Sequence, residues 1–174
     1  MATPPILTLQ NGVLPTNPQF WLDAATAEVR KFCGWHILPE VTEELVLDGD
    51  GGTDLLAPTG HIIDVTACTN DGADVLPALD WSAAGLLTLS CGRWTRKNRG
   101  VRITLTHGFT EAPDVAGVVA TVAGRAAQQI GPVVRQNAGP MGVSYGTVNG
   151  APISLPLLQS EKDILTPYKL VWGA

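Results

Sequence analysis

The chain has 174 residues, of which 45% are hydrophobic and 16% are charged. This composition excludes a disordered acidic or basic protein, and the length allows one domain with appendages. The formal net charge of −5 argues against a surface that binds nucleic acid throughout, and the 19 Gly and 13 Pro follow no period typical of collagen or repeat folds.

The N-terminal segment 1–16 contains three prolines and no periodicity, so we expect an irregular arm without a secretion signal. A helix is predicted over 18–33. Asn17 can cap it, Pro18 suits its first position, apolar residues recur at helical spacing, and Gly34 ends it.

Between 40 and 109 the apolar period changes to two, which predicts an antiparallel β unit of five or six strands. The glycine-rich DGDGG sequence at 48–52 is interpreted as a hairpin turn between the first two strands. The expected strands lie at 41–47, around 53–57, at 61–69, in a hairpin over 79–90 and at 101–109.

A second helix is predicted over 114–130, opened by Pro113 and stopped by Gly131 and Pro132. Its valines form one apolar face. A second face carries small residues, so we expect the helix to be buried on two sides, by its own core and by a neighbouring molecule. The small-residue face consists of Ala116, Ala120, Ala123 and Ala127.

The C-terminal part is predicted to be a separate segment, 137–174, that follows a single α+β domain over 1–136. Residues 137–157 are rich in Gly and Pro, which indicates a loop or an extended excursion. A short helix is expected at about 161–166, followed by an apolar end that we interpret as a docking arm. The apolar residues of this arm are Ile164, Leu165, Tyr168, Leu170 and Trp172.

Charge is distributed unevenly along the sequence. Ten of the sixteen acidic residues fall within 40–80, whereas the predicted strand from 101 is approached by a basic run. Such a run can bind phosphates, can be a solvated loop, or can contact an acidic neighbouring molecule, and we favour the protein contact. Its members are Arg93, Arg96, Lys97 and Arg99.

No catalytic, cofactor or metal site is predicted. Cys33 and His36 have metal-like spacing but no second pair, and the acidic residues at 48, 50 and 54 do not fit a calcium loop. His107 alternates with apolar positions and is interpreted as a hydrogen-bonded core histidine. The three cysteines are widely spaced, so we expect free thiols in a reducing compartment. The longest apolar helical stretch is too short to cross a membrane.

Several segments in this order resemble the head-to-tail adaptor, or connector, proteins of long-tailed bacteriophages, in particular those of actinobacterial phages. The resemblance covers 18–130 and, more weakly, 160–170. It is carried by ATAEVRKFCGWHILP, LDGDGG, DWSAAGLL, RWTRKNRGVRITLTHGF, a Pro-opened Ala-rich helix and SEKDILTPYKL.

The resemblance implies a virion structural protein, not an enzyme, made in the bacterial host cytoplasm. Such proteins form a ring, commonly of twelve subunits, beneath the portal protein. The ring joins the DNA-filled head to the stopper or tail, and DNA passes through its channel without sequence-specific binding. The fold implied is a small helical core with a β insertion, here at 40–109. The small-residue face, the basic run and the apolar end would then be subunit or portal interfaces.

Two alternatives remain open from the sequence. The chain could be another head-completion or tail-completion protein of the same assembly. It could also be a small β-rich module that binds carbohydrate, for which Trp81 and Trp94 are the candidate platform residues.

Overall fold

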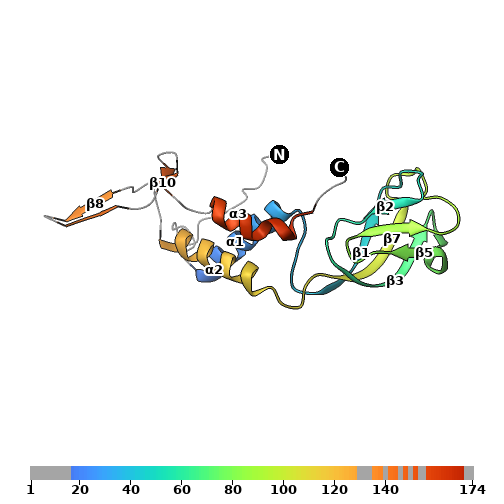
Figure 1. Cartoon of the computed structure of the whole chain (residues 1–174), viewed down its shortest axis with the longest axis horizontal. Helices are drawn as coiled ribbons and strands as arrows, with labels where there is room; N and C mark the ends of the chain where they lie inside the picture. Colours follow the sequence, from blue (N-terminus) through green and yellow to red (C-terminus); the bar gives the residue numbers. More distant parts are fainter. Residues whose placement is uncertain are drawn as a thin grey trace, which may run out of the picture. The chain divides into compact units, whose positions relative to one another are not determined.

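The computed structural model describes residues 17–128, 135–138, 141–144, 147–148, 151–152 and 156–170 (Figure 1). These residues combine helices with antiparallel sheets, so the fold is α+β, as predicted. They divide into two compact units. The helical unit lies within Met1–Val29 and Asp114–Glu161, and the β unit lies within Arg30–Pro113 and Lys162–Ala174. The chain therefore passes from one unit to the other after Val29, after Pro113 and after Glu161, and not at 136, where a boundary was expected.

Helix α1 spans Pro18–Cys33, as predicted. The Asn17 side chain accepts a hydrogen bond from the Gln19 backbone N–H at 2.9 Å, which satisfies one of the free donors of the first turn. Gly34, with a φ of +85°, follows the last helical residue. Ala25 and Val29 are buried on one side of the helix.

The β unit contains two sheets whose strand pairs are all antiparallel. The first has the order β1-β7-β3-β4, and the second has the order β2-β6-β5. The strands are β1 (Val41–Leu47), β2 (Asp54–Leu56), β3 (Ile62–Asn70), β4 (Ala73–Asp74), β5 (Leu79–Trp81), β6 (Leu86–Leu89) and β7 (Val101–His107). A short 3-10 turn, Leu76–Ala78, precedes β5.

The core of the β unit follows the predicted alternation. Every second residue of β7, from Val101 to His107, is buried, and these side chains pack with residues of β2, β3 and β6. Trp94 is 2% exposed and joins this core. Burial of this indole removes it from any surface platform.

The predicted hairpin at 48–52 is wrong. Strand β1 pairs with β7 and β2 pairs with β6, so this loop carries the chain from one sheet to the other. The loop also bonds to the loop after β6, because the N–H groups of Gly49 and Gly51 donate to the carbonyls of Lys97 and Thr95. A Cβ at Gly49 would collide with the Thr95 carbonyl oxygen, so the glycine permits this close approach.

Helix α2 spans Pro113–Gln128, and the last two residues of the predicted range, 129 and 130, lie outside the described residues. Val115, Val118, Val122 and Ala126 form its buried face. Within the part of the chain that the structure describes, no helix combines the length and apolarity needed to cross a membrane.

The glycine- and proline-rich part, where a loop or an extended excursion was expected, contains two short strand pairs. Strand β8 (Arg135–Ala138) pairs with β9 (Met141–Ser144), and β10 (Thr147–Val148) pairs with β11 (Ala151–Pro152). Strands of two to four residues are too short to show a detectable period in the sequence.

The last helix, α3, spans Gln159–Leu165 and starts earlier than expected. Ser160 is its second residue. The Glu161 carboxylate accepts a hydrogen bond from the Leu158 backbone N–H at 2.8 Å, which is half of a capping box. A 3-10 turn over Thr166–Tyr168, containing Pro167, follows the helix.

Candidate functional site

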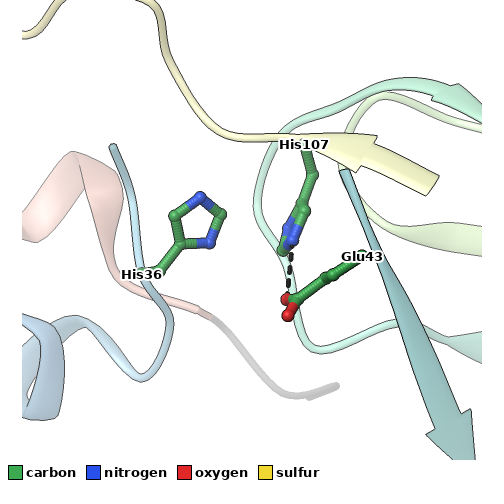
Figure 2. Close-up of side chains that lie close together, drawn as sticks. All are labelled: His36, Glu43 and His107. Atoms are coloured by element: carbon green, nitrogen blue, oxygen red, sulfur yellow. Dashed lines mark hydrogen bonds and ion pairs between the residues drawn. The ribbon is translucent and has the colours of Figure 1, made fainter. Parts of the chain in front are cut away.

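The β unit brings together His36, Glu43 and His107 (Figure 2). One ligand atom from each residue, an imidazole nitrogen or a carboxylate oxygen, lies within 4.8 Å of the other two. We name these three residues the His–Glu cluster. His36 precedes β1 and Glu43 lies on β1, whereas His107 is distant in sequence and ends β7.

The pairing of β1 with β7 explains why Glu43 meets His107. In this register Val41 lies opposite His107 and Glu43 lies opposite Leu105. Glu43 and His107 are therefore diagonal neighbours on one face, a separation that long side chains can bridge. His107 Nε2 and Glu43 Oε1 are 3.0 Å apart (Figure 2).

The segment that carries His36 is held by hydrogen bonds within the β unit. The Arg30 guanidinium donates to the carbonyls of His36 and Leu38, at 3.1 and 2.9 Å, and the Phe109 N–H donates to the Ile37 carbonyl at 2.8 Å. Ile37 is buried and has a φ of +63°, which is unfavourable for a β-branched residue. The surrounding bonds therefore fix a backbone conformation that the segment would not adopt alone.

Each imidazole of the cluster also contacts a hydrogen-bonding group outside the cluster, which orients its ring. His36 Nε2 lies 2.9 Å from the Pro39 carbonyl oxygen. Because a carbonyl only accepts, Nε2 carries the hydrogen and Nδ1 keeps its lone pair. His107 Nδ1 lies 2.8 Å from Thr59 Oγ1, and Thr59 is fully buried.

Gly108 allows the His36 ring to approach the end of β7. Its φ is +108°, and a Cβ at this position would lie 2.7 Å from His36 Nε2 and 2.7 Å from the Pro39 carbonyl oxygen. Any side chain here would displace the imidazole or the backbone beside it, so glycine is required by both space and conformation.

Burial sets the protonation of His107. Desolvation lowers its pKa below the ordinary value of 6.5, and the nearby His36 acts in the same direction, whereas Glu43 opposes the change. His107 is therefore neutral at pH 7. A neutral imidazole beside a carboxylate and a second imidazole can exchange protons or bind a metal ion.

Aromatic rings surround the cluster on its buried side. Trp35 stacks on His107, with ring centroids 6.5 Å apart, and its indole N–H donates to the Tyr168 carbonyl at 2.7 Å. The third histidine of the chain, His61, instead packs against Phe109, with centroids 4.4 Å apart.

From the sequence, His36 was considered only as a partner of Cys33 and Glu43 was not identified, whereas His107 was correctly predicted to be a buried, hydrogen-bonded residue. A signal for Glu43 was present. In the sequence it occupies the same phase as the apolar residues Leu45 and Leu47, just as His107 shares the phase of Ile103 and Leu105. Polar residues in the apolar phase of two strands are candidates for a shared polar site.

The basic run is exposed, but one of its charges is compensated within the chain. Lys97 Nζ forms an ion pair with Asp71 at 2.7 Å, with both side chains more than half exposed. The side chains of Arg93, Arg96 and Arg99 are exposed and form no ion pair with another described residue.

An acidic groove of about 1010 Å³ lies beside the basic run in the same unit. Its charged lining is Asp48, Asp50, Asp54 and Arg99, and its apolar lining includes Leu56 and Leu86. The carboxylates have separate partners. Asp48 accepts from the Arg99 N–H, Asp50 from the Gly52 N–H and Asp54 from the Thr88 hydroxyl.

The predicted small-residue face of α2 is exposed within the subunit at three of its four alanines: Ala116, Ala120 and Ala127. Ala123 is only 5% exposed and belongs to the buried face, so its assignment to the outer face is wrong. The exposed face also contains Gly117 and Gly124, where an added Cβ would meet no atom of the described part of the chain within 4 Å.

The predicted docking arm packs largely on its own subunit. Leu165 is fully buried, its carbonyl lies 3.8 Å from Cys33 Sγ, and the Leu170 N–H donates to the Cys33 carbonyl at 2.8 Å. Tyr168 and Leu170 are partly buried. Ile164 remains 45% exposed, and Trp172 lies outside the described residues.

No family model matches the chain, and no curated protein matches it. Solved structures do match, each over 90% of this chain. One is a chain of the neck of an empty gene transfer agent (GTA) particle computed with C6 symmetry, at 15% identity, a TM-score of 0.60 and 79% coverage of that chain.

A second is a chain of the neck of a native GTA particle computed with C12 symmetry, at 16% identity, a TM-score of 0.61 and 84% coverage. A third comes from the virion of a native GTA particle, at 14% identity, a TM-score of 0.58 and 78% coverage. At these identities the similarity establishes a shared fold. The chain has the fold of proteins found in the neck and virion of gene transfer agent particles.

Proposed function

We propose that this chain is a virion structural protein of the head-to-tail neck of a bacteriophage. Its copies form a ring beneath the portal, joined to the stopper or tail, with DNA passing through the channel. The observation that carries this proposal is the shared fold. It spans nine tenths of this chain and is shared with chains from GTA particle necks computed with C6 and C12 symmetry. The protein acts in the virion by assembly and not as an enzyme.

The exposed face of α2 is suited to contact between subunits. A helix surface built from Ala116, Ala120 and Ala127, with glycines between them, lets a second backbone approach closely. Among the residues that the structure describes, none lies within 4 Å of a Cβ built at Gly117 or Gly124. In the ring we assign this face to a neighbouring copy.

Charge complementarity offers a second contact. Arg93 and Arg96 are exposed members of the basic run, and the acidic groove with Asp50 and Asp54 lies beside that run in the same unit. Copies that meet head to tail can place the arginines of one against the groove of the next, and such heterologous contacts close into rings. Lys97 contributes less, because Asp71 of its own chain already pairs with it.

The carbohydrate-binding alternative loses support from the burial of Trp94. Of the two candidate platform residues, only Trp81 is exposed, at 38% of its surface, and a single indole is a small platform for a sugar. The second alternative, another head-completion or tail-completion protein of the same assembly, would also be a virion structural protein. The two assignments differ in the partner that the chain binds.

The proposal is tested by electron microscopy and sedimentation of the full chain, alone and with tailless DNA-filled heads. We expect rings or ring-decorated head vertices. Charge reversal by Arg93→Glu with Arg96→Glu should weaken assembly in a salt-dependent manner, whereas Lys31→Glu, a charge reversal outside the basic run, should not. A monomer that does not bind heads would refute the proposal, and binding to tails alone would support a tail-completion protein.

A further inference from the structure

We propose that His36, Glu43 and His107 bind a divalent transition-metal ion, with Zn²⁺ as the best match. The inference goes beyond the proposed function and does not depend on ring formation. No metal site was predicted from the sequence, because the Cys33–His36 pair lacks a complementary second pair. The fold supplies a set drawn from the segment before β1, from β1 and from β7.

The donor set determines which ion fits. Two imidazole nitrogens and one carboxylate oxygen are borderline ligands that suit zinc and its neighbours in the first transition row, whereas calcium and magnesium prefer oxygen alone. Three protein ligands are sufficient for zinc when water or another molecule takes the fourth position. The half-exposed Glu43, with 47% of its side chain accessible, gives that position access to solvent.

The existing geometry requires only a small contraction. The three ligand atoms lie within 4.8 Å of one another, and Glu43 Oε1 is already 3.0 Å from His107 Nε2. Ligand atoms around tetrahedral zinc are about 3.3 Å apart, from bond lengths of about 2.0–2.1 Å. Rotation of the partly exposed Glu43 and His36 side chains can close the difference while His107 stays in the core (Figure 2).

The hydrogen bond that His36 makes outside the cluster leaves the lone pair of its other ring nitrogen available for a metal ion. His36 donates through Nε2 to the Pro39 carbonyl, so Nδ1 is free to bind, and among the described residues Nδ1 has no hydrogen-bond partner. Zinc-binding histidines characteristically donate their other N–H to an oxygen in this way.

His107 needs a change of tautomer, and Thr59 allows it. In the metal-free protein Nε2–H donates to the Glu43 carboxylate, so Nδ1 accepts from the Thr59 hydroxyl. With an ion bound at Nε2, the hydrogen resides on Nδ1 and is donated to Thr59 Oγ1. A hydroxyl can donate or accept, and the neutral imidazole keeps one hydrogen in both states, so His107 releases no net proton.

The test is isothermal titration of ZnCl₂ into the tag-free full chain carrying Cys91→Ser, because Cys91 is an exposed thiol that could bind zinc itself. We expect about one ion per subunit. His36→Ala and Glu43→Gln alter side chains that are partly exposed, so both variants should fold, and each should weaken binding by at least about tenfold. The matched control is His61→Ala, which removes the histidine outside the cluster and should bind zinc as the parent does.

A second measurement reports on the coordination itself. Co²⁺ in the same site should give a visible absorption spectrum that His36→Ala abolishes and His61→Ala preserves. Thr59→Val should weaken zinc binding by about 10–100-fold through loss of the orienting bond to His107, while circular dichroism shows an unchanged fold. Absence of zinc binding by the parent, or equal binding by the His36→Ala and His61→Ala variants, would overturn the proposal.

Discussion

Leu165 and Ile164 are adjacent residues of α3 in opposite environments, and this contrast gives a direct test of what the C-terminal segment does. Leu165 is fully buried, whereas Ile164 is 45% exposed. Truncating both to alanine removes a similar volume of aliphatic side chain. We expect Leu165→Ala to destabilise the protein and Ile164→Ala to leave its stability nearly unchanged.

The magnitude follows from burial. Removing the side chain of a fully buried leucine costs about 2–5 kcal/mol, because apolar contacts are lost and a cavity remains. For a chain of this length, each kcal/mol lowers the midpoint of thermal unfolding by about 2–4 °C. Leu165→Ala should therefore lower the midpoint of the β unit by at least about 4 °C, and Ile164→Ala by less than about 2 °C.

The assay is thermal and urea unfolding followed by circular dichroism and by tryptophan fluorescence, to which the buried Trp94 contributes. Binding to tailless heads is measured on the same two variants. Ile164→Ala should reduce binding while the protein stays folded, because the exposed isoleucine is the part of α3 that remains available to a partner. Equal unfolding midpoints for the two variants would refute the packing of Leu165 against its own subunit.

Three further predictions concern other elements. Glu161→Gln should cost about 3 kcal/mol in urea unfolding, because it removes the negative charge that pairs with the Arg125 guanidinium at a carboxylate that is only 8% exposed. Ala123→Leu should destabilise the monomer by about 1–3 kcal/mol, whereas Ala120→Leu on the exposed face should leave the monomer stable and impair assembly in sedimentation. Because burial lowers the pKa of His107, the unfolded chain takes up a proton below pH 6.5 that the folded chain does not. Urea midpoints should therefore fall as the pH decreases from 6.5, and His107→Gln should reduce this slope.

The pH prediction can be separated from the effect of Glu161. Burial raises the pKa of Glu161, but hydrogen bonds from Arg125 and from the Leu158 N–H outweigh this and hold it below its ordinary value of 4.5. The stability that Glu161 contributes is present above pH 4.5 and is lost as the pH falls through its lower folded-state pKa. A decrease in stability that begins only below pH 4.5 would contradict the prediction for His107.

The elements that the sequence predicted best are those defined by local chemistry. Helix α1 matches its predicted bounds because Asn17 caps its start and Gly34 ends it, and both act on the backbone next to them. Strand β7 begins where it was predicted and ends at His107, two residues before the predicted end, because one face is buried and the period of two is visible in seven residues. In both cases the deciding interactions lie within a few residues of the signal.

The features that the sequence did not predict depend on contacts between distant residues. The loop at 48–52 looked like a hairpin, but strand β1 found its partner in β7, about sixty residues away. The His–Glu cluster is a consequence of that pairing, because only the β1–β7 register places Glu43 beside His107. Local propensity carries no information about such a partner.

The C-terminal segment shows how one short stretch can serve both folding and assembly. Within the β unit, the Tyr168 carbonyl accepts from the Trp35 indole, and the Leu170 N–H donates to the Cys33 carbonyl. The same Trp35 ring stacks on His107 of the His–Glu cluster. A truncation that removes this segment would therefore disturb the β unit as well as any docking surface, so loss of head binding by a truncated chain would not identify a docking role. Point substitutions at exposed positions can separate the two effects, since an exposed side chain contributes little to stability and can still contribute to a contact.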